Sequence, residues 1–317
     1  MASHSRANYD ETPLCMASSL NMEYLDSLAR RAGSAGSLEA CHEIVNDNAV
    51  ARHLARLGYR FVYKGSGAGQ STVETADLEL NRETETEIPH DSQGSLFRPD
   101  PDSPRHHPRY DLHRALITGV FTSLGAASRL PFRKFVFAHV MAPHPPFVFG
   151  EDGQAVYPRG AMTLSDASWL RLSYTREAYA KAYIAQLQHV NALTLNAIDT
   201  VIKQSKTPPI IVVQGDHGSR MTLDWSSLDH TDVRETFSIL NAYYVPKRAE
   251  RQLYDSISPV NSFRIVLSSV FGEKLALLKD RSYYSTVEEP YKFVDVTEAS
   301  ATTGGKGAAP PVEMRAK

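Results

Sequence analysis

Residues 208–220 read PPIIVVQGDHGSR, and this stretch decides the fold class. Residues 210–213 (IIVV) form a run of β-branched apolar residues, which is typical of a strand buried on both faces of a parallel sheet. Asp216 and His217 follow shortly after the run and lie between two glycines. In open α/β sheets, functional side chains collect just beyond the carboxyl ends of the strands. The stretch therefore predicts an α/β fold with a site at this end of the strand.

The rest of the chain alternates between helical and strand-like segments. Five segments have the apolar spacing or character of helices: 12–32, 38–57, 111–128, 175–205 and 260–271. Three have the apolar and aromatic character of strands: 59–63, 135–140 and 237–245. This alternation predicts a single α/β domain over residues 1–296, with a largely parallel sheet covered by helices on both faces.

Two segments lack the apolar pattern of a packed domain. Residues 65–110 are polar, partly acidic and rich in turn-forming residues, which indicates a surface excursion. The residues from 297 to 317 include ASATTGGKGAAPP, a composition typical of a disordered tail.

Composition excludes several classes of protein. The 317 residues carry 34 basic and 36 acidic side chains, and a formal net charge of -2 gives no global field that would attract nucleic acid. The two cysteines, Cys15 and Cys41, are too few for a disulfide scaffold or a four-cysteine zinc module. No stretch approaches the roughly 18 apolar residues of a membrane span, and the first residues lack the apolar region of a secretory signal.

The Asp216–His217 pair suits a divalent metal ion. The carboxylate supplies negative charge, and the neutral imidazole supplies a directional nitrogen ligand. The alternative is that Asp216 caps a turn and His217 is merely exposed. From the dipeptide alone, both interpretations stay open.

Two more residues are candidates for the same site, each with a plain structural alternative. His144 follows the predicted strand 135–140 within APHPPF, where prolines stiffen the loop, and it could donate a hydrogen bond to an anionic oxygen. A histidine that packs against Phe147 is the alternative. Thr12 begins a predicted helix, a position that favours anions, but its hydroxyl could equally serve as an ordinary helix cap.

Three motifs resemble one family when they are taken together. ETPLCMASSLN, FAHVMAPHPPFVF and PPIIVVQGDHGSR occur in the order and character seen in the sulfatase-like branch of the alkaline phosphatase superfamily. NAYYVP (241–246) and SPVNSFRIVLSSVFG (258–272) also look like the later part of such domains. The resemblance spans roughly residues 8–285 and implies an alkaline-phosphatase-like α/β fold.

The resemblance also implies roles for individual residues. Thr12 matches the nucleophile, which is also a metal ligand in these enzymes. Asp216 and His217 match metal ligands, and His144 matches the histidine that contacts the phosphoryl or sulfuryl oxygens of the substrate. The implied function is metal-dependent hydrolysis or transfer of phosphate esters, with sulfate esters second. The implied cofactor is one divalent ion, Mn²⁺, Zn²⁺, Ca²⁺ or Mg²⁺.

This chain departs from the family pattern in two ways, which change the expected substrate and the expected extent of the chain. Formylglycine sulfatases carry C-x-P-S-R, whereas this chain has Thr12 at the aligned position, and threonine cannot become formylglycine. Relatives also begin with a strand that ends in an acidic ligand well before the nucleophile. Only eleven residues precede Thr12, so we expect an N-terminally truncated chain.

These departures leave a second class of function open, a catalytically inactive sulfatase-like remnant that acts as a binding module. For either class, the expected partner is an anionic ester that is lipid- or glycan-linked. The family further implies a membrane-anchored, extracytoplasmic location, although no transmembrane segment is expected in these residues.

Overall fold

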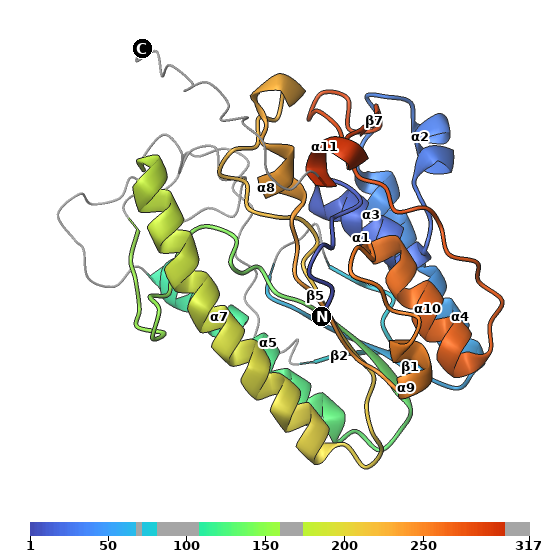
Figure 1. Cartoon of the computed structure of the whole chain (residues 1–317). Coiled ribbons are helices and arrows are strands. Elements are labelled where there is room, and N and C mark those ends of the chain that lie inside the picture. The colour runs from blue at the N-terminus through green and yellow to red at the C-terminus, as the bar shows by residue number, and fades with distance from the viewer. Residues whose placement is uncertain (68–71, 81–107, 159–173, 302–317) are drawn as a thin grey trace. The chain divides into compact units, whose positions relative to one another are not determined.

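The computed structural model describes residues 1–67, 72–80, 108–158 and 174–301 (Figure 1). The chain forms two compact units. Met1–His53 with Ile210–Lys317 form the first, which we call the terminal unit, and Leu54–Pro209 form the second, which we call the central unit. The count of one domain over residues 1–296 stays a prediction.

The terminal unit contains the first helices and the last third of the chain. Its elements in chain order are α1 (Thr12–Asn21), α2 (Asp26–Ala32), α3 (Glu39–Asn46), β4 (Ile211–Gln214), η3 (Leu228–His230), α8 (Val233–Phe237), β5 (Asn241–Tyr244), α9 (Lys247–Glu250), α10 (Pro259–Phe271), β6 (Tyr283–Tyr284), β7 (Val294–Asp295) and α11 (Thr297–Ala301). Helix α4 (Ala49–Arg56) begins in this unit and ends in the central one.

Helix α1 is almost entirely buried and packs against α3 and α10. Pro13 near its start favours helix initiation, because proline lacks the N–H group that the first turn leaves without an intrahelical partner. The helix ends where Met22 adopts a left-handed conformation and its N–H bonds to Ser18 O. Asn21 then donates to Ile44 O at 2.9 Å, which fixes the end of α1 to α3. The helix that begins at Thr12 is therefore held over its whole length.

Strand β4 pairs with β5 in antiparallel register, from Ile211 opposite Tyr244 to Gln214 opposite Asn241. The pairing continues beyond the strand, since Gly218 N donates to Thr236 O at 2.7 Å. A side chain at Gly218 would overlap backbone oxygens of the facing segment, so only glycine allows this close approach. The turn that carries Asp216 and His217 is thus fixed by backbone contacts.

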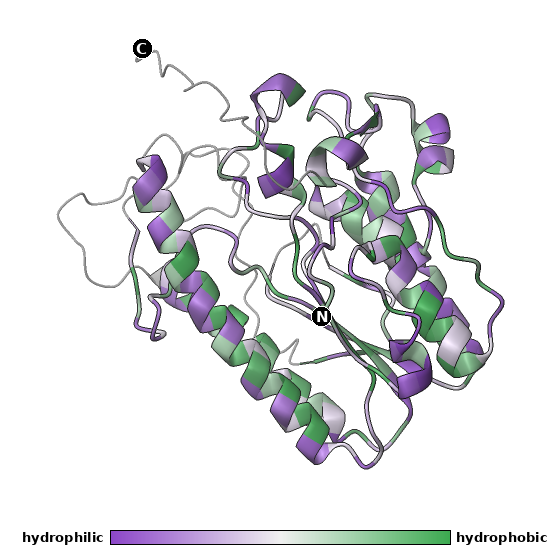
Figure 2. Ribbon diagram, in the orientation of Figure 1, coloured by the Kyte–Doolittle hydropathy of each residue, from purple (hydrophilic) through white to green (hydrophobic). Residues whose placement is uncertain are grey.

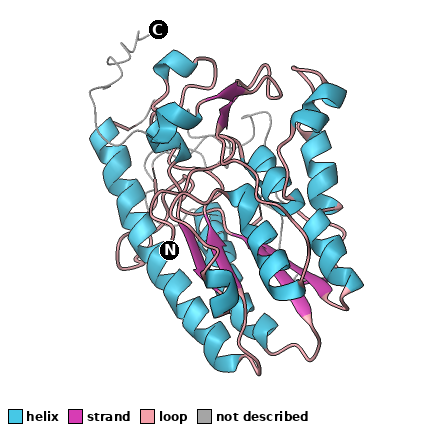
Figure 3. Ribbon diagram, turned by 45° about the vertical axis from the view of Figure 1, so that its right-hand side comes forward, coloured by secondary structure: helices cyan, strands magenta, loops and turns pink. Residues whose placement is uncertain are grey.

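The central unit contains a three-stranded parallel sheet in the order β2 (Leu78–Glu79), β1 (Arg60–Gly65), β3 (Lys134–His139). Helices α5 (Pro108–Ser128) and α7 (Arg176–Gln204) lie side by side, and hydrophilic and hydrophobic bands alternate along α7 in Figure 2. Helices predominate in both units, as Figure 3 shows. The apolar core of the central unit consists of Tyr110, Leu116, Ile117, Phe121, Val148, Phe149, Val190 and Ala197.

His113 of α5 is fully buried, and neither ring nitrogen has a hydrogen-bond partner among the described residues. Burial is the main cause that lowers its pKa to about 4, and the charge of Arg114 adds to it. The unfolded chain takes up a proton first as the pH falls, at a pKa of about 6.5, so acidification favours unfolding. Between about pH 6.5 and about pH 4, we expect this histidine to reduce the unfolding free energy by about 3 kcal/mol.

The variant His113→Leu should lack this part of the pH dependence and lose less stability on acidification. Urea denaturation of wild type and variant at matched pH values measures the difference. Parallel stability profiles for the two proteins would contradict the prediction.

The structure differs from the sequence-based expectation in several places. The predicted helix 38–57 forms two helices, α3 and α4. The segment 12–32 forms two helices because the chain turns at Met22. Residues 297–301 of the expected disordered tail form α11. The Asp295 side chain accepts a hydrogen bond from Thr297 N, at the start of this helix, at 3.0 Å. Within the expected excursion 65–110, β2 pairs with β1, whereas 68–71 and 81–107 lie outside the described residues, as do 302–317 of the tail.

Candidate functional site

The chain segment that leads into Thr12 is held on both sides within the terminal unit. Ala7 N donates to Phe237 O at 2.9 Å, and Tyr283 N donates to Asn8 O at 2.9 Å. The segment therefore lies between the chain that follows β4 and the chain near β6. This arrangement fixes the direction in which α1 begins, and so fixes the position of Thr12.

Three of the predicted site residues meet at one point. Thr12 Oγ1 donates a hydrogen bond to Asp216 Oδ2 at 2.7 Å and lies 3.2 Å from His217 Nε2. Asp216 Oδ2 and His217 Nε2 are 3.4 Å apart. Glu11, not Thr12, occupies the N-cap position of α1, and the Thr12 hydroxyl bonds to Asp216 instead of to the helix backbone. The cap interpretation of Thr12 is therefore wrong.

The hydrogen bonds of His217 fix its tautomer. Nδ1 lies 2.8 Å from Gly218 O, and a carbonyl oxygen can only accept, so Nδ1 carries the proton. Arg220 Nη2 lies 2.8 Å from Nε2, and a guanidinium can only donate. Nε2 is therefore an acceptor. His217 is thus a neutral imidazole, which is the form that ligates metals, and its Nε2 accepts from Arg220 while lying 3.2 Å from Thr12 Oγ1.

The donor atoms of this cluster fit a divalent metal ion. Ligand atoms about 2.1 Å from one ion lie about 3.0 to 3.4 Å from each other in octahedral and tetrahedral sites. Two of the three separations lie in this range, at 3.2 Å from Thr12 Oγ1 to His217 Nε2 and 3.4 Å from Asp216 Oδ2 to His217 Nε2, while Thr12 Oγ1 and Asp216 Oδ2 are joined by a hydrogen bond of 2.7 Å. Among the described residues, no group of three or more His, Cys, Asp and Glu side chains is arranged to hold a metal. The set has one carboxylate and one imidazole, with a hydroxyl as its third donor.

Asp10 is a buried carboxylate two residues before the predicted nucleophile. Its Oδ2 accepts a hydrogen bond from Ser285 N at 3.2 Å, while its Oδ1 is buried with no partner among the described residues. Burial raises the pKa of Asp10 to about 7, although the Ser285 N–H and the charge of Arg220 act against that rise. Burial thus favours the neutral form of this carboxyl group over the charged form that an exposed aspartate has.

Arg220 contacts this cluster, and the sequence alone did not predict a role for it. Besides bonding to His217 Nε2, its Nη2 lies 3.4 Å from Asp10 O, and the guanidinium lies 4.6 Å from the centre of the Trp225 ring. Its position three residues after His217, within the same motif, is the only signal that the sequence offers.

His144 lies in the central unit, so its role as a substrate-binding residue stays a prediction. Its Nδ1 lies 2.5 Å from Pro145 O and donates to it. The side chain of Gln186 in α7 holds the loop, because Nε2 donates to His144 O at 3.1 Å and Oε1 accepts from Val148 N at 2.7 Å. A buried glutamine therefore fixes this loop together with its prolines.

Cys15 lies one helical turn after Thr12, but its side chain is buried in the core. It is 3% exposed, and its thiol donates to Tyr9 O at 3.1 Å. Burial, together with the nearby charges of Asp216 and Asp10, raises the pKa of the thiol. The thiolate is the reactive form of cysteine, so this side chain is a poor nucleophile.

We expect Cys15 to resist alkylation in the folded protein and to react only after unfolding. Cys15→Ala should cost about 1–2 kcal/mol of stability, because it leaves a small cavity. The ester-cleaving activity of Cys15→Ala should stay within about twofold of wild type, because Cys15 has no role in the proposed reaction. Mass spectrometry after iodoacetamide treatment, with and without denaturant, checks the first part. Rapid alkylation of the native protein would contradict it.

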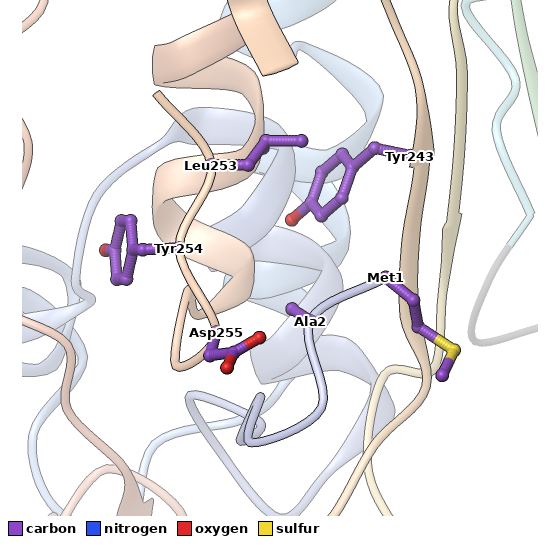
Figure 4. Close-up of a pocket in the computed structure, with 6 residues that line it drawn as sticks. All are labelled: Met1, Ala2, Tyr243, Leu253, Tyr254 and Asp255. Atoms are coloured by element: carbon purple, nitrogen blue, oxygen red, sulfur yellow. The ribbon is translucent and has the colours of Figure 1, made fainter. Parts of the chain in front are cut away.

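A separate pocket of about 260 Å³ lies elsewhere in the terminal unit (Figure 4). Its lining residues are Met1, Ala2, Tyr243, Leu253, Tyr254 and Asp255. None of the residues that meet at Thr12 lines this pocket. It is therefore not the site that the motifs predict.

No family model matches the chain, and no curated protein matches it in sequence. Solved structures do match. A phosphonate monoester hydrolase from Silicibacter pomeroyi is 12% identical with a TM-score of 0.54, and the match covers 89% of this chain and 71% of that one. The C-terminal periplasmic domain of a phosphoethanolamine transferase from Campylobacter jejuni is 11% identical with a TM-score of 0.48, over 88% and 79%.

A putative sulfatase from Bacteroides thetaiotaomicron is 13% identical with a TM-score of 0.49, and the match covers 90% of this chain and 65% of that one. At such identities a likeness shows the fold alone. The likeness to the phosphonate monoester hydrolase, with a TM-score above 0.5, confirms the fold class that the three motifs implied.

Proposed function

We propose that this chain, which has the sulfatase-like fold of the alkaline phosphatase superfamily, is a metal-dependent hydrolase or transferase of phosphate esters. One observation carries the proposal, which is that Thr12 Oγ1 lies 2.7 Å from Asp216 Oδ2 and 3.2 Å from His217 Nε2. A hydroxyl, a carboxylate and a neutral imidazole from positions about two hundred residues apart meet at one point. Such a set provides a nucleophile and the groups that activate it.

Thr12 is the proposed nucleophile. It is half-buried, so its hydroxyl is fixed by hydrogen bonds yet open to a substrate. Oγ1 forms a bond to phosphorus while the bond from phosphorus to the ester oxygen breaks. The hydroxyl proton passes along the hydrogen bond to Asp216 Oδ2, and the leaving oxygen takes up a proton from solvent. Water or an alcohol then cleaves the phosphothreonine.

Asp216, His217 and the Thr12 hydroxyl are the proposed ligands of one divalent ion. When bound, such an ion lowers the pKa of a ligating hydroxyl and offsets negative charge on the transferred group. The Nδ1–H bond from His217 to Gly218 O fixes the ring and leaves Nε2 without a proton, 3.2 Å from Thr12 Oγ1. The candidate ions are Mn²⁺, Zn²⁺, Ca²⁺ and Mg²⁺, and reconstitution with each ion in turn identifies which of them is bound.

Phosphate esters are preferred over sulfate esters because of the nucleophile. Thr12 cannot form the formylglycine of the sulfatases, and the buried thiol of Cys15 is not placed to replace it. The resemblance of the motifs further supports a substrate that is lipid- or glycan-linked, a role for His144 on its oxygens, and an extracytoplasmic location. None of the helices among the described residues has the length and apolar character that a membrane span requires.

The test is hydrolysis of aryl phosphate monoesters, aryl phosphate diesters and aryl sulfates by the purified protein after reconstitution with each ion in turn. We expect phosphate ester cleavage that a chelator abolishes and that one of the ions restores. Turnover that is indifferent to chelation would contradict the metal dependence. Metal binding without turnover of any ester would favour the binding module.

A further inference from the structure

The guanidinium of Arg220 contacts the Thr12 cluster through His217. Its Nη2 bonds to His217 Nε2 at 2.8 Å, and Thr12 Oγ1 lies 3.2 Å from that same nitrogen. The arginine and the hydroxyl therefore share one neighbour. Arg220 also belongs to the backbone segment that β4 and its turn hold in place.

The charge of Arg220 is not neutralised by a carboxylate. Among the described residues it forms no ion pair, and its Nη2 bonds only to the neutral imidazole of His217 and to the backbone oxygen of Asp10. Its Nε is buried and has no hydrogen-bond partner within the part of the chain that the structure describes. A buried donor without a partner costs about 1–3 kcal/mol, so this arrangement needs an acceptor that a ligand could supply.

Trp225 holds the guanidinium from one face, at 4.6 Å from the ring centre. A cation that stacks on an aromatic ring keeps the edge of its planar fork available for hydrogen bonds. That edge presents several N–H donors in the geometry that matches two oxygens of a phosphate. The stack therefore leaves Arg220 oriented but still able to bind an anion.

We propose that Arg220 binds the non-bridging oxygens of the phosphoryl group that Thr12 attacks. The inference rests on the proposed function, because it assigns a further residue to the same site. As the Thr12 Oγ1–phosphorus bond forms and the ester bond breaks, negative charge on these oxygens meets the fixed donors of Arg220. Because Arg220 Nη2 and a bound ion would compete for the lone pair of His217 Nε2, an ion at this nitrogen would release the Nη2 donor for the phosphoryl oxygens.

The first test measures binding without turnover. Inorganic phosphate is titrated by calorimetry into metal-loaded wild-type protein and into metal-loaded Arg220→Gln protein. We expect Arg220→Gln to weaken phosphate binding about tenfold or more while metal content stays the same. Equal phosphate affinity in both proteins, or no phosphate binding in either, would overturn the proposal.

The second test uses kcat/KM with an aryl phosphate ester. Arg220→Gln should lower it by about 10²–10³, whereas Arg220→Lys, which keeps the charge but not the fork, should lower it less. Arg248→Gln is the matched control, since Arg248 is exposed on α9 and donates only to Val270 O at 2.9 Å. Loss of bound metal in Arg220→Gln would indicate that Arg220 only positions His217, and would overturn the assignment.

The two tests also separate this inference from the proposed function. If the protein shows no turnover but Arg220→Gln still weakens phosphate binding, the anion site stands and the chemistry is wrong. If turnover depends on Thr12 and metal but not on Arg220, the proposed function stands and the arginine assignment is wrong.

Discussion

Replacement of Thr12 by alanine should abolish ester cleavage, with kcat/KM reduced by about 10³-fold or more. The reason is that Thr12 Oγ1 is the proposed nucleophile, and the variant has no hydroxyl to form the bond to phosphorus or to donate to Asp216 Oδ2, which lies 2.7 Å away. The loss should appear in kcat, because substrate binding uses other groups. Steady-state kinetics with an aryl phosphate ester measures it.

Two control variants make the Thr12 result specific. Thr12→Ser keeps the hydroxyl and should retain part of the activity, while Cys15→Ala alters the same helix away from the hydroxyl. Helix α1 is buried against α3 and α10, so thermal unfolding must confirm that each variant is folded. Unchanged turnover in folded Thr12→Ala would remove this residue from the mechanism.

Loss of either Asp216 or His217 should release the bound metal. Asp216→Asn removes the negative charge, and His217→Gln removes the lone pair at Nε2 that lies 3.2 Å from Thr12 Oγ1. Changes next to a metal ligand already cost about 10–100-fold in affinity, so the loss of a ligand should cost about 100-fold or more. Elemental analysis after dialysis and competition with a chromophoric chelator measure the affinity.

His230→Gln is the matched control for His217→Gln. His230 is exposed in η3, and its Nδ1 lies 3.4 Å from Asp224 Oδ2, so it pairs with a carboxylate but not with Thr12. This variant should keep the metal. Retention of metal in both Asp216→Asn and His217→Gln would rule out these residues as ligands.

The sequence predicts those parts of the fold and site that depend on short-range patterns. The run 210–213 predicted a strand, and the structure has β4 with Asp216 and His217 just beyond its carboxyl end. The long helix 175–205 appears as α7 because its cap at Thr175 and its apolar face are local features. The convergence of Thr12 with the DHG turn was implied by the resemblance of the three motifs to the sulfatase-like family.

Other features depend on contacts between distant segments and have no local pattern. The antiparallel pairing of β4 with β5 is one of them, since an apolar run alone does not reveal the direction of its partner. Arg220 is another, because its contacts with His217, Asp10 and Trp225 come from the path of the chain after the turn. The break after α1 depends on a methionine in a left-handed conformation, which propensity does not favour.

The central claim is that the Thr12 hydroxyl, the Asp216 carboxylate and the His217 imidazole bind one cation. Anomalous diffraction from crystals grown with Mn²⁺ or Zn²⁺, recorded at the absorption edge of the ion, tests it most directly. We predict one strong peak within coordination distance of Thr12 Oγ1, Asp216 Oδ2 and His217 Nε2. A peak that contacts other side chains, or no peak at this point in crystals that hold the ion elsewhere, would contradict the account.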